Sequence, residues 1–546
     1  MKLRTILMIL TSAVLFPLAL PNEIFPFGNF ALGLICLVPY YFAISELKTP
    51  GKASLGGIIF GAVSTLLANY WLMFYGEFWV WTLGGVVVGY IGYNALFTPF
   101  LWRFLRTPNH YRPFLFAGAW AAYEYLKSVG YLGYPWGLSA YPAGNILPLV
   151  QFVDVTGVWG LSFLMILVNV LAAEGIMFVI KYTSPIETVK KRYKTSFFTQ
   201  VPKIRRRPYL SGNILASQWV FCILILTGVL IYGGIRLGKN IPVRKKVDVV
   251  LVQQNSDSWV RGNELKTIKT AQDLSREGIN EHHEVPDIVV WSETTLPWDY
   301  RLHKDYYSEN PAGDPLVSFL SEIGTYLVTG ATIRIDPETG DGMNGVILLS
   351  QEGNVIDYYG KQHPVPFAEH IPFWEYEPVQ RFFKETVGLY STWTIGSRYT
   401  LFSVPVDQKQ ELTFGTPICF EDAFAYLCRN FILKGAEILV NLTNNSWSRT
   451  DSAQIQHFVA ARFRSIENKR VLLRSTNSGF TSVVDPWGRI IQSIPMFEEG
   501  YIAAEIPVYR ESTFTIYTLL GDYFPLMLLI LLFLYLASSI KKGADS

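Results

Sequence analysis

Long apolar runs dominate the first half of the chain, and one more follows near its end. A transmembrane helix needs about 20 mainly apolar residues, because the hydrocarbon core of a bilayer is about 30 Å thick. The pattern therefore predicts an α-helical membrane domain with about eight transmembrane helices. The expected spans are 5–21, 29–46, 54–75, 78–101, 113–127, 148–180, 217–236 and 522–540.

Lysine and arginine residues between these runs predict the orientation of the spans. Basic loops stay on the cytoplasmic side of a membrane, and every basic cluster falls on one side when all the spans are counted. The most basic loop lies between residues 181 and 207. This predicts cytoplasmic chain ends and an outer region from about 240 to 515. The first 21 residues also resemble a signal peptide, but no clear cleavage site follows them, so we expect an uncleaved span.

Beyond Val247 the pattern changes to short apolar runs that alternate with amphipathic stretches, which is typical of a layered α/β domain. We expect a membrane domain of seven helices at 1–240, an α/β domain at 241–515, and a last helix with a short tail at 516–546. The expected strands are 247–255, 287–293, 326–333, 345–350, 355–361, 437–444, 471–477, 480–486 and one that ends at Cys419. The expected helices are 262–280, 315–324, 424–434 and 451–468.

Composition agrees with a membrane protein that has a sizeable soluble part. Of the 546 residues, 16% are charged and 50% are hydrophobic, whereas globular proteins average about 25% charged residues. The net charge of +2 gives no basic surface for nucleic acid. Four cysteines are too few for a disulfide framework. No heptad or self-complementary patch is evident, so we expect a monomer.

Three predicted strands of the outer domain end in side chains suited to acyl transfer. Glu293 ends VVWSE, Lys361 ends VIDYYGK and Cys419 ends GTPIC. A carboxylate can take the proton of a cysteine nucleophile, and an ammonium can stabilise the thiolate and a developing oxyanion. Strand ends are where an α/β sheet presents its ligands, so the three form a complete set without histidine. Each residue alone is equally compatible with a structural role, such as a packed cysteine or a solvated glutamate.

Four motifs, in this order, resemble the signatures of the nitrilase superfamily: VVWSETTLPW, YYGKQHPVPFAEHIP, TPICFED and LVNLTNNSW. Together with the multispan first half and the last span, they make nearly the whole chain similar to the apolipoprotein N-acyltransferases, the membrane-embedded branch of that superfamily. The resemblance implies a nitrilase-like αββα sandwich. It also implies a bacterial inner-membrane location, with the catalytic domain on the periplasmic side.

The resemblance further implies a role for individual residues. Glu293 would be the general base, Lys361 the oxyanion-stabilising residue and Cys419 the nucleophile. Glu369 and Glu421 match further acidic positions of the family site. The remaining positions implied in substrate binding are Trp259, Asn444 and Phe420.

Two positions depart from the family pattern. Phe420 stands where a tyrosine is common, and NNSWSR at 444–449 stands where the family has NDxWFG. Both departures lie around the expected pocket and leave the Glu-Lys-Cys set intact.

The implied reaction is a ping-pong transfer from a phospholipid, through a cysteine thioester, to the amine of a diacylated apolipoprotein, with no metal or cofactor. A membrane-tethered amidase or nitrilase would use the same side chains and is the alternative. A transporter or binding scaffold is a third possibility, for which Glu124 and Asp154 are the few ionisable candidates in the spans.

The Gly- and Pro-rich stretch 130–142 is either an ordinary interfacial loop or a lip for lipid entry. The aromatic stretch 371–383 suits either domain packing or a lid.

Overall fold

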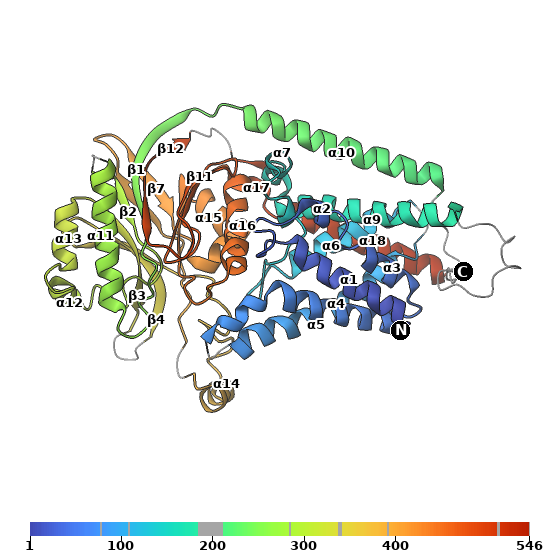
Figure 1. Ribbon diagram of the computed structural model, residues 1–546, viewed down its shortest axis with the longest axis horizontal. Coiled ribbons are helices and arrows are strands. Elements are labelled where there is room, and N and C mark those ends of the chain that lie inside the picture. The colour runs from blue at the N-terminus through green and yellow to red at the C-terminus, as the bar shows by residue number, and fades with distance from the viewer. Residues whose placement is uncertain are drawn as a thin grey trace, which may run out of the picture.

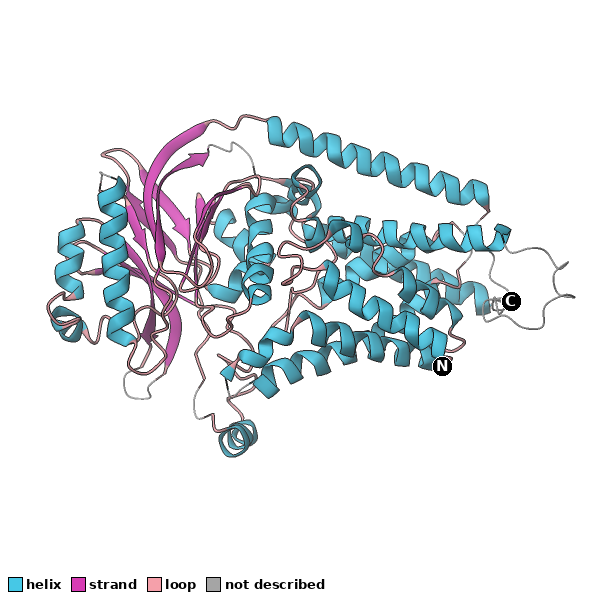
Figure 2. Ribbon diagram, in the orientation of Figure 1, coloured by secondary structure: helices cyan, strands magenta, loops and turns pink. Residues whose placement is uncertain are grey.

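The computed structural model describes residues 1–76, 79–107, 110–183, 211–282, 285–336, 341–389, 392–509 and 514–544. A bundle of helices occupies one end of the molecule, and two β-sheets with flanking helices occupy the other (Figures 1 and 2). Most of the predicted basic loop between residues 181 and 207 lies outside the described residues.

All eight expected apolar runs are helical, but only four of the described helices are long and apolar enough to cross a membrane by length and composition: α4, α5, α9 and α10. The run expected at 148–180 is broken, because Gly157 adopts a φ of +64° between α8 and α9. The helices of this part are α1 (Leu3–Ala19), α2 (Phe30–Gly33), α3 (Val38–Glu46), α4 (Pro50–Ala68), η1 (Tyr70–Phe74), α5 (Trp79–Phe104), α6 (Arg112–Leu126), η3 (Tyr141–Ala143), α7 (Leu147–Val150), α8 (Val153–Thr156), α9 (Val158–Thr183), α10 (Gly212–Gly238) and α18 (Tyr523–Ala544).

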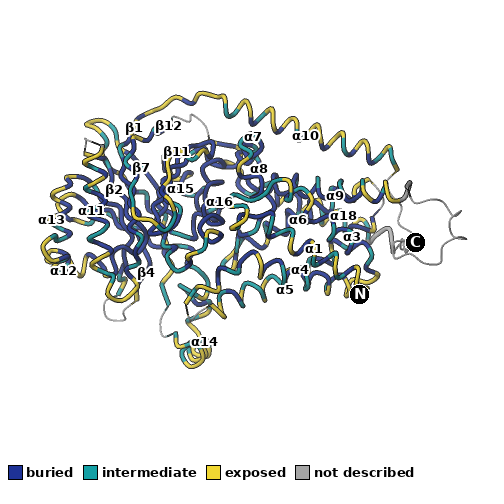
Figure 3. Tube along the Cα trace, viewed as in Figure 1, coloured by how far each residue is buried: buried dark blue, intermediate teal, exposed yellow. Residues whose placement is uncertain are grey.

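The interior of the bundle is rich in aromatic residues. Trp120 of α6 is buried, and its ring contacts those of Phe16, Tyr40 and Phe60 at centroid distances of 6.1 to 6.4 Å. Edge-on aromatic pairs of this kind add to the stabilisation that comes from burial alone. By contrast, α10 runs along the outside of the bundle and is exposed over much of its length (Figure 3).

Two six-stranded sheets form the second part, with orders β12-β1-β2-β3-β4-β5 and β11-β10-β9-β8-β7-β6. Strands β1, β2 and β3 of the first sheet and β7, β8 and β9 of the second are parallel, and all the other neighbouring pairs are antiparallel. The strands are β1 (Val243–Gln253), β2 (Ile288–Val290), β3 (Tyr326–Arg334), β4 (Gly342–Leu349), β5 (Val355–Gly360), β6 (Leu401–Pro405), β7 (Glu411–Gly415), β8 (Ile438–Thr443), β9 (Leu472–Thr476), β10 (Ser482–Val484), β11 (Ile490–Ser493) and β12 (Gly500–Tyr509).

The sheets face each other, as the hydrogen bond from Ser475 Oγ in β9 to the Val252 carbonyl in β1 shows at 2.9 Å. Helices pack on the outer face of each sheet, and α16 lies between the second sheet and the bundle (Figure 1). The expected two-sheet α/β domain is therefore confirmed. The remaining helices are α11 (Glu264–His282), α12 (Lys304–Glu309), α13 (Leu316–Ile323), α14 (Glu377–Phe382), η4 (Phe383–Val387), η5 (Cys419–Ala423), α15 (Ala425–Leu433), α16 (Asp451–Asn468) and α17 (Ile516–Leu520).

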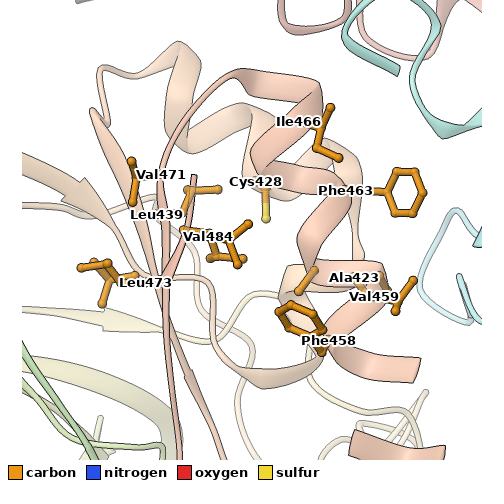
Figure 4. Close-up of a cluster of buried hydrophobic side chains, with 14 of the residues drawn as sticks. Ala423, Cys428, Leu439, Phe458, Val459, Phe463, Ile466, Val471, Leu473 and Val484 are labelled. Atoms are coloured by element: carbon orange, nitrogen blue, oxygen red, sulfur yellow. The ribbon is translucent and has the colours of Figure 1, made fainter. Parts of the chain in front are cut away.

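The core between the second sheet and α16 includes Cys428 (Figure 4). Its side chain is fully buried among apolar neighbours from α16, β8 and β9, and all four cysteines are free thiols. Cys428 therefore packs as a small hydrophobic residue, and its sulfur forms no disulfide with Cys419.

Candidate active site

The sequence predicted that Cys419 ends a strand, but the structure places it in a tight turn beyond the strand. Strand β7 ends at Gly415, and Pro417 has no N–H with which to continue the ladder. Cys419 then begins the short helix η5 with a φ of +47°. Left-handed backbone is costly for a residue other than glycine and is found most often at functional sites.

Lys361, directly after β5, is buried between two carboxylates. Its Nζ lies 3.2 Å from Glu293 Oε1 and 2.8 Å from Glu369 Oε1, and only 1% of the side chain is exposed. Glu293 follows β2, and Glu369 follows β5 by nine residues in the chain. Three positions that the sequence had marked are thus brought into direct contact.

Each of these carboxylates is also held by neutral donors. Asn344 of β4 donates through Nδ2 to Glu293 Oε1 at 2.7 Å and to Glu369 Oε1 at 3.0 Å. The N–H of Asn444 donates to Glu293 Oε2 at 2.6 Å, and the N–H of Val365 to Glu369 Oε2 at 2.7 Å. Sequence reasoning missed Asn344, although a buried amide within the apolar run GMNGVILL is the signal that could have found it.

The charged groups around Cys419 act on the pKa of its thiol in opposite directions. Burial and the Glu293 carboxylate raise the pKa of the Cys419 thiol well above its usual value, while the Lys361 ammonium opposes them. Burial lowers the pKa of Lys361, but Glu293 and Glu369 outweigh it, and the net pKa is well above the usual range. Lysine is therefore charged and the resting cysteine is a thiol, so a base must remove its proton at the moment of attack.

Glu421 joins the segment after Lys361 to the turn that carries the cysteine. Its Oε1 accepts hydrogen bonds from the N–H groups of Gln362 and His363, at 2.6 and 2.9 Å. Its Oε2 accepts from the N–H of Ile418 at 2.7 Å. Burial raises the pKa of Glu421 from 4.5 to about 7, although these donors pull it down. Glu421 fixes the backbone on both sides of the site.

Asn444 tethers the loop that carries Trp259. Its Nδ2 donates to Asp257 Oδ1 and to Thr294 Oγ1, each at 3.0 Å. Trp259 is half-exposed, and its ring lies 5.9 Å from that of Trp393. Trp259 therefore lies at the rim of the site, and Asn444 lies against Glu293.

The helical bundle reaches the site through its loops. The ring of Phe420 stacks on Trp136, from the Gly- and Pro-rich stretch, with centroids 5.4 Å apart and planes 22° apart. Tyr75, which follows η1, contacts the Trp447 ring at 4.9 Å. The residue next to the cysteine is thus covered by aromatic side chains of the membrane domain. Among the described residues, no group of three or more His, Cys, Asp and Glu side chains is placed to hold a metal.

Two family models match the chain. Residues 12–171 match the apolipoprotein N-acyltransferase N-terminal domain, and residues 249–513 match the carbon-nitrogen hydrolase domain. The solved structure of a carbon-nitrogen hydrolase from Helicobacter pylori is 18% identical, with 48% of this chain and 89% of that chain covered and a TM-score of 0.35.

Curated relatives match over nearly the full length. Apolipoprotein N-acyltransferase 2 of Treponema denticola is 37% identical over 96% of this chain and 95% of its own. Apolipoprotein N-acyltransferase of Borreliella burgdorferi is 31% identical over 98% of this chain and 95% of its own. With both domains matched in order, the chain belongs to the apolipoprotein N-acyltransferase family.

Proposed function

We propose that this protein transfers an acyl chain from a phospholipid, through a thioester on Cys419, to the N-terminal amine of diacylglyceryl-cysteine on an apolipoprotein. The observation that carries the proposal is the buried Lys361 ammonium between Glu293 and Glu369, next to a cysteine in a left-handed turn. No metal or organic cofactor takes part in the proposed chemistry.

In the first half-reaction, Glu293 takes the thiol proton as the sulfur of Cys419 attacks the ester carbonyl of the phospholipid. The Lys361 ammonium and the N–H of Phe420 stabilise the oxyanion. When the tetrahedral intermediate collapses, the C–O bond to glycerol breaks, and Glu293 returns its proton to the departing alkoxide. A lysophospholipid leaves, and the acyl group remains as a thioester.

In the second half-reaction, the amine of the diacylated cysteine attacks the thioester carbonyl. Glu293 accepts a proton from the attacking nitrogen, the C–S bond breaks, and the thiol of Cys419 is restored by that proton. Glu369 holds the ammonium of Lys361 in place throughout, because the two groups are 2.8 Å apart. Trp259, Asn444 and Phe420 would line the path of the substrates.

The arrangement of the chain suits substrates that are anchored in a membrane. We propose eight spans, cytoplasmic chain ends, and a monomer in the bacterial inner membrane with its catalytic domain on the periplasmic side. The proposed domains are 1–240, 241–515 and 516–546. The stack of Phe420 on Trp136 supports a site held close to the membrane, because it joins the residue after Cys419 to a loop of the helical bundle.

A membrane-tethered amidase or nitrilase-type hydrolase remains the alternative, because it would use the same three side chains and pass the acyl group to water. The two functions are separated by the acceptor. Purified protein is supplied with a phospholipid that carries a labelled acyl chain, with and without a diacylated lipopeptide that has a free N-terminal amine. Labelled amide on the peptide supports the transferase. Release of labelled free acid at the same rate with and without peptide would contradict it, and the Cys419→Ser protein is the control.

A further inference from the structure

A buried histidine outside the Glu-Lys-Cys cluster contacts the backbone of the nucleophile. His457 projects from α16 and places Nε2 3.2 Å from the Cys419 carbonyl oxygen and 2.8 Å from Asp422 Oδ1. Arg474 of β9 donates through Nε to the other oxygen of Asp422 at 3.2 Å. His457 is 4% exposed, and Asp422 and Arg474 are fully buried.

These contacts require a proton on Nε2 of the imidazole, while Nδ1 lies 3.4 Å from Asn445 Oδ1. Both atoms that face Nε2 are acceptors, the Cys419 carbonyl and the Asp422 carboxylate, so Nε2 must be the donor. Asp422 is held by Arg474 on its other oxygen, which fixes the ring in the way that a carboxylate orients a histidine in other sites. The N–H of His457 is thus shared between the Asp422 carboxylate, at 2.8 Å, and the carbonyl of Cys419, at 3.2 Å.

The peptide bond between Cys419 and Phe420 is the unit on which this hydrogen bond acts. Its carbonyl accepts from His457 and also from Asn441 Nδ2, at 3.3 Å. Its N–H belongs to Phe420, and no described residue accepts a hydrogen bond from that N–H. Hydrogen bonds to a carbonyl polarise the whole amide and make its N–H a stronger donor. They also hold the amide plane in an orientation that the left-handed turn alone would not guarantee.

We propose that His457 is a positioning residue: by holding and polarising the Cys419–Phe420 peptide, it prepares the Phe420 N–H to stabilise the oxyanion of acyl transfer. Asp422 and Arg474 act only through it, by fixing the ring. The inference rests on the proposed acyl transfer at Cys419, and it adds a role that the three clustered side chains do not supply.

The experiment compares two reactions of the same thiol in His457→Ala, His457→Gln and wild type. Thioester formation from phospholipid passes through an oxyanion, whereas alkylation by iodoacetamide displaces iodide and forms none. Glutamine carries an N–H donor at the end of a side chain of similar reach, so it should restore part of the function. Thermal unfolding in detergent shows that each variant is folded.

We expect His457→Ala to slow thioester formation by about 10- to 100-fold, somewhat less than the loss of a whole oxyanion donor, while alkylation changes less than about twofold. His457→Gln should recover most of that loss. Equal losses in both reactions would overturn the proposal and assign His457 to packing or to the reactivity of the thiol, and so would an unchanged rate of thioester formation.

The two proposals fail in different ways. If wild type is alkylated but forms no thioester with phospholipid, the acyl-transfer function fails, and the role of His457 fails with it. If wild type forms the thioester and the alanine variant matches it, only the role of His457 is lost.

Discussion

Trp136, from the loop after α6, stacks on Phe420, the residue that follows Cys419, with ring centroids 5.4 Å apart. The two residues are 284 positions apart in the chain and belong to different domains. The contact places aromatic surface of the membrane domain against the turn that carries Cys419. In the proposed acyl transfer, a phospholipid held by the bundle would approach the thiol at this contact.

Replacing Trp136 with alanine should weaken the use of phospholipid without damaging the thiol. A stacked aromatic pair contributes about 0.5–1.5 kcal/mol beyond its buried area, so we expect the acylation efficiency to fall by about 2- to 13-fold. Trp298→Ala, at an exposed tryptophan of the α/β domain, is the matched control. Equal acylation by Trp136→Ala and wild type, with phospholipid below saturation, would show that the contact is only structural.

Lys361→Met should abolish most of the acyl transfer. The change removes the charge that we propose stabilises the oxyanion, for which a loss of about 10²- to 10³-fold is expected. It also removes the cation that lowers the pKa of Cys419, so alkylation by iodoacetamide should be slower at a given pH. Lys246→Met, at an exposed lysine paired with Glu505, is the control. Unchanged alkylation across the pH range would contradict the lowering of the thiol pKa by the Lys361 ammonium.

Asn344→Leu should reduce both stability and rate. Its amide donates to Glu293 and Glu369, and a leucine of similar size leaves both buried acceptors with one donor fewer. Loss of a buried partner costs about 1–3 kcal/mol, which thermal unfolding would detect, and thioester formation should slow as the carboxylates move. Asn354→Ala, on an exposed turn, is the control. An unfolding temperature equal to that of wild type would rule out this role.

Sequence reasoning found the chemistry and many elements because both are local. Helix α16 begins and ends at the predicted residues, since Thr450 caps its N-terminus and its apolar positions recur with the helical period. Glu293, Lys361 and Glu369 were marked from motifs and do meet. The order of strands and helices predicted a layered α/β domain, and the resemblance to the nitrilase superfamily implied its two sheets.

Contacts between distant segments could not be predicted in this way. Strand β12 pairs with β1 across about 250 residues, and its alternating burial is too weak a signal to reveal a partner. The left-handed turn at Cys419 is held by hydrogen bonds with the side chains of Glu421, Asn441 and His457. None of these partners is evident from the local sequence pattern. The number of membrane spans likewise stays a prediction: four described helices are long and apolar enough to cross a membrane, and the run 148–180 is interrupted at Gly157.

Glu421 should give the protein a pH-dependent stability. Burial raises its pKa from 4.5 to about 7, so between these values the folded chain binds more protons than the unfolded chain. Its contribution is therefore fully present below pH 4.5 and is lost as the pH rises through about 7. Glu421→Gln removes the titrating carboxyl group. It also replaces one of the two oxygens that accept from three backbone N–H groups with an NH₂ donor, so the variant should be less stable overall.

The measurement is the unfolding temperature in detergent from pH 5 to pH 8 for both proteins. The difference between wild type and Glu421→Gln should shrink as the pH rises, because only wild type carries the titrating carboxyl. A constant difference over this range would contradict the raised pKa.

The central claim is that Cys419 carries the acyl group between donor and acceptor. The most direct test is the mass of the intact protein after brief exposure to phospholipid, followed by addition of a diacylated lipopeptide amine. The account predicts one added acyl chain, located at Cys419 by peptide mapping and absent in Cys419→Ser, which disappears as N-acylated peptide forms. Two results would contradict the account. In one, folded wild-type protein produces N-acylated peptide without an acyl adduct on Cys419. In the other, the adduct forms but is lost to water even when the amine is present, and no N-acylated peptide appears.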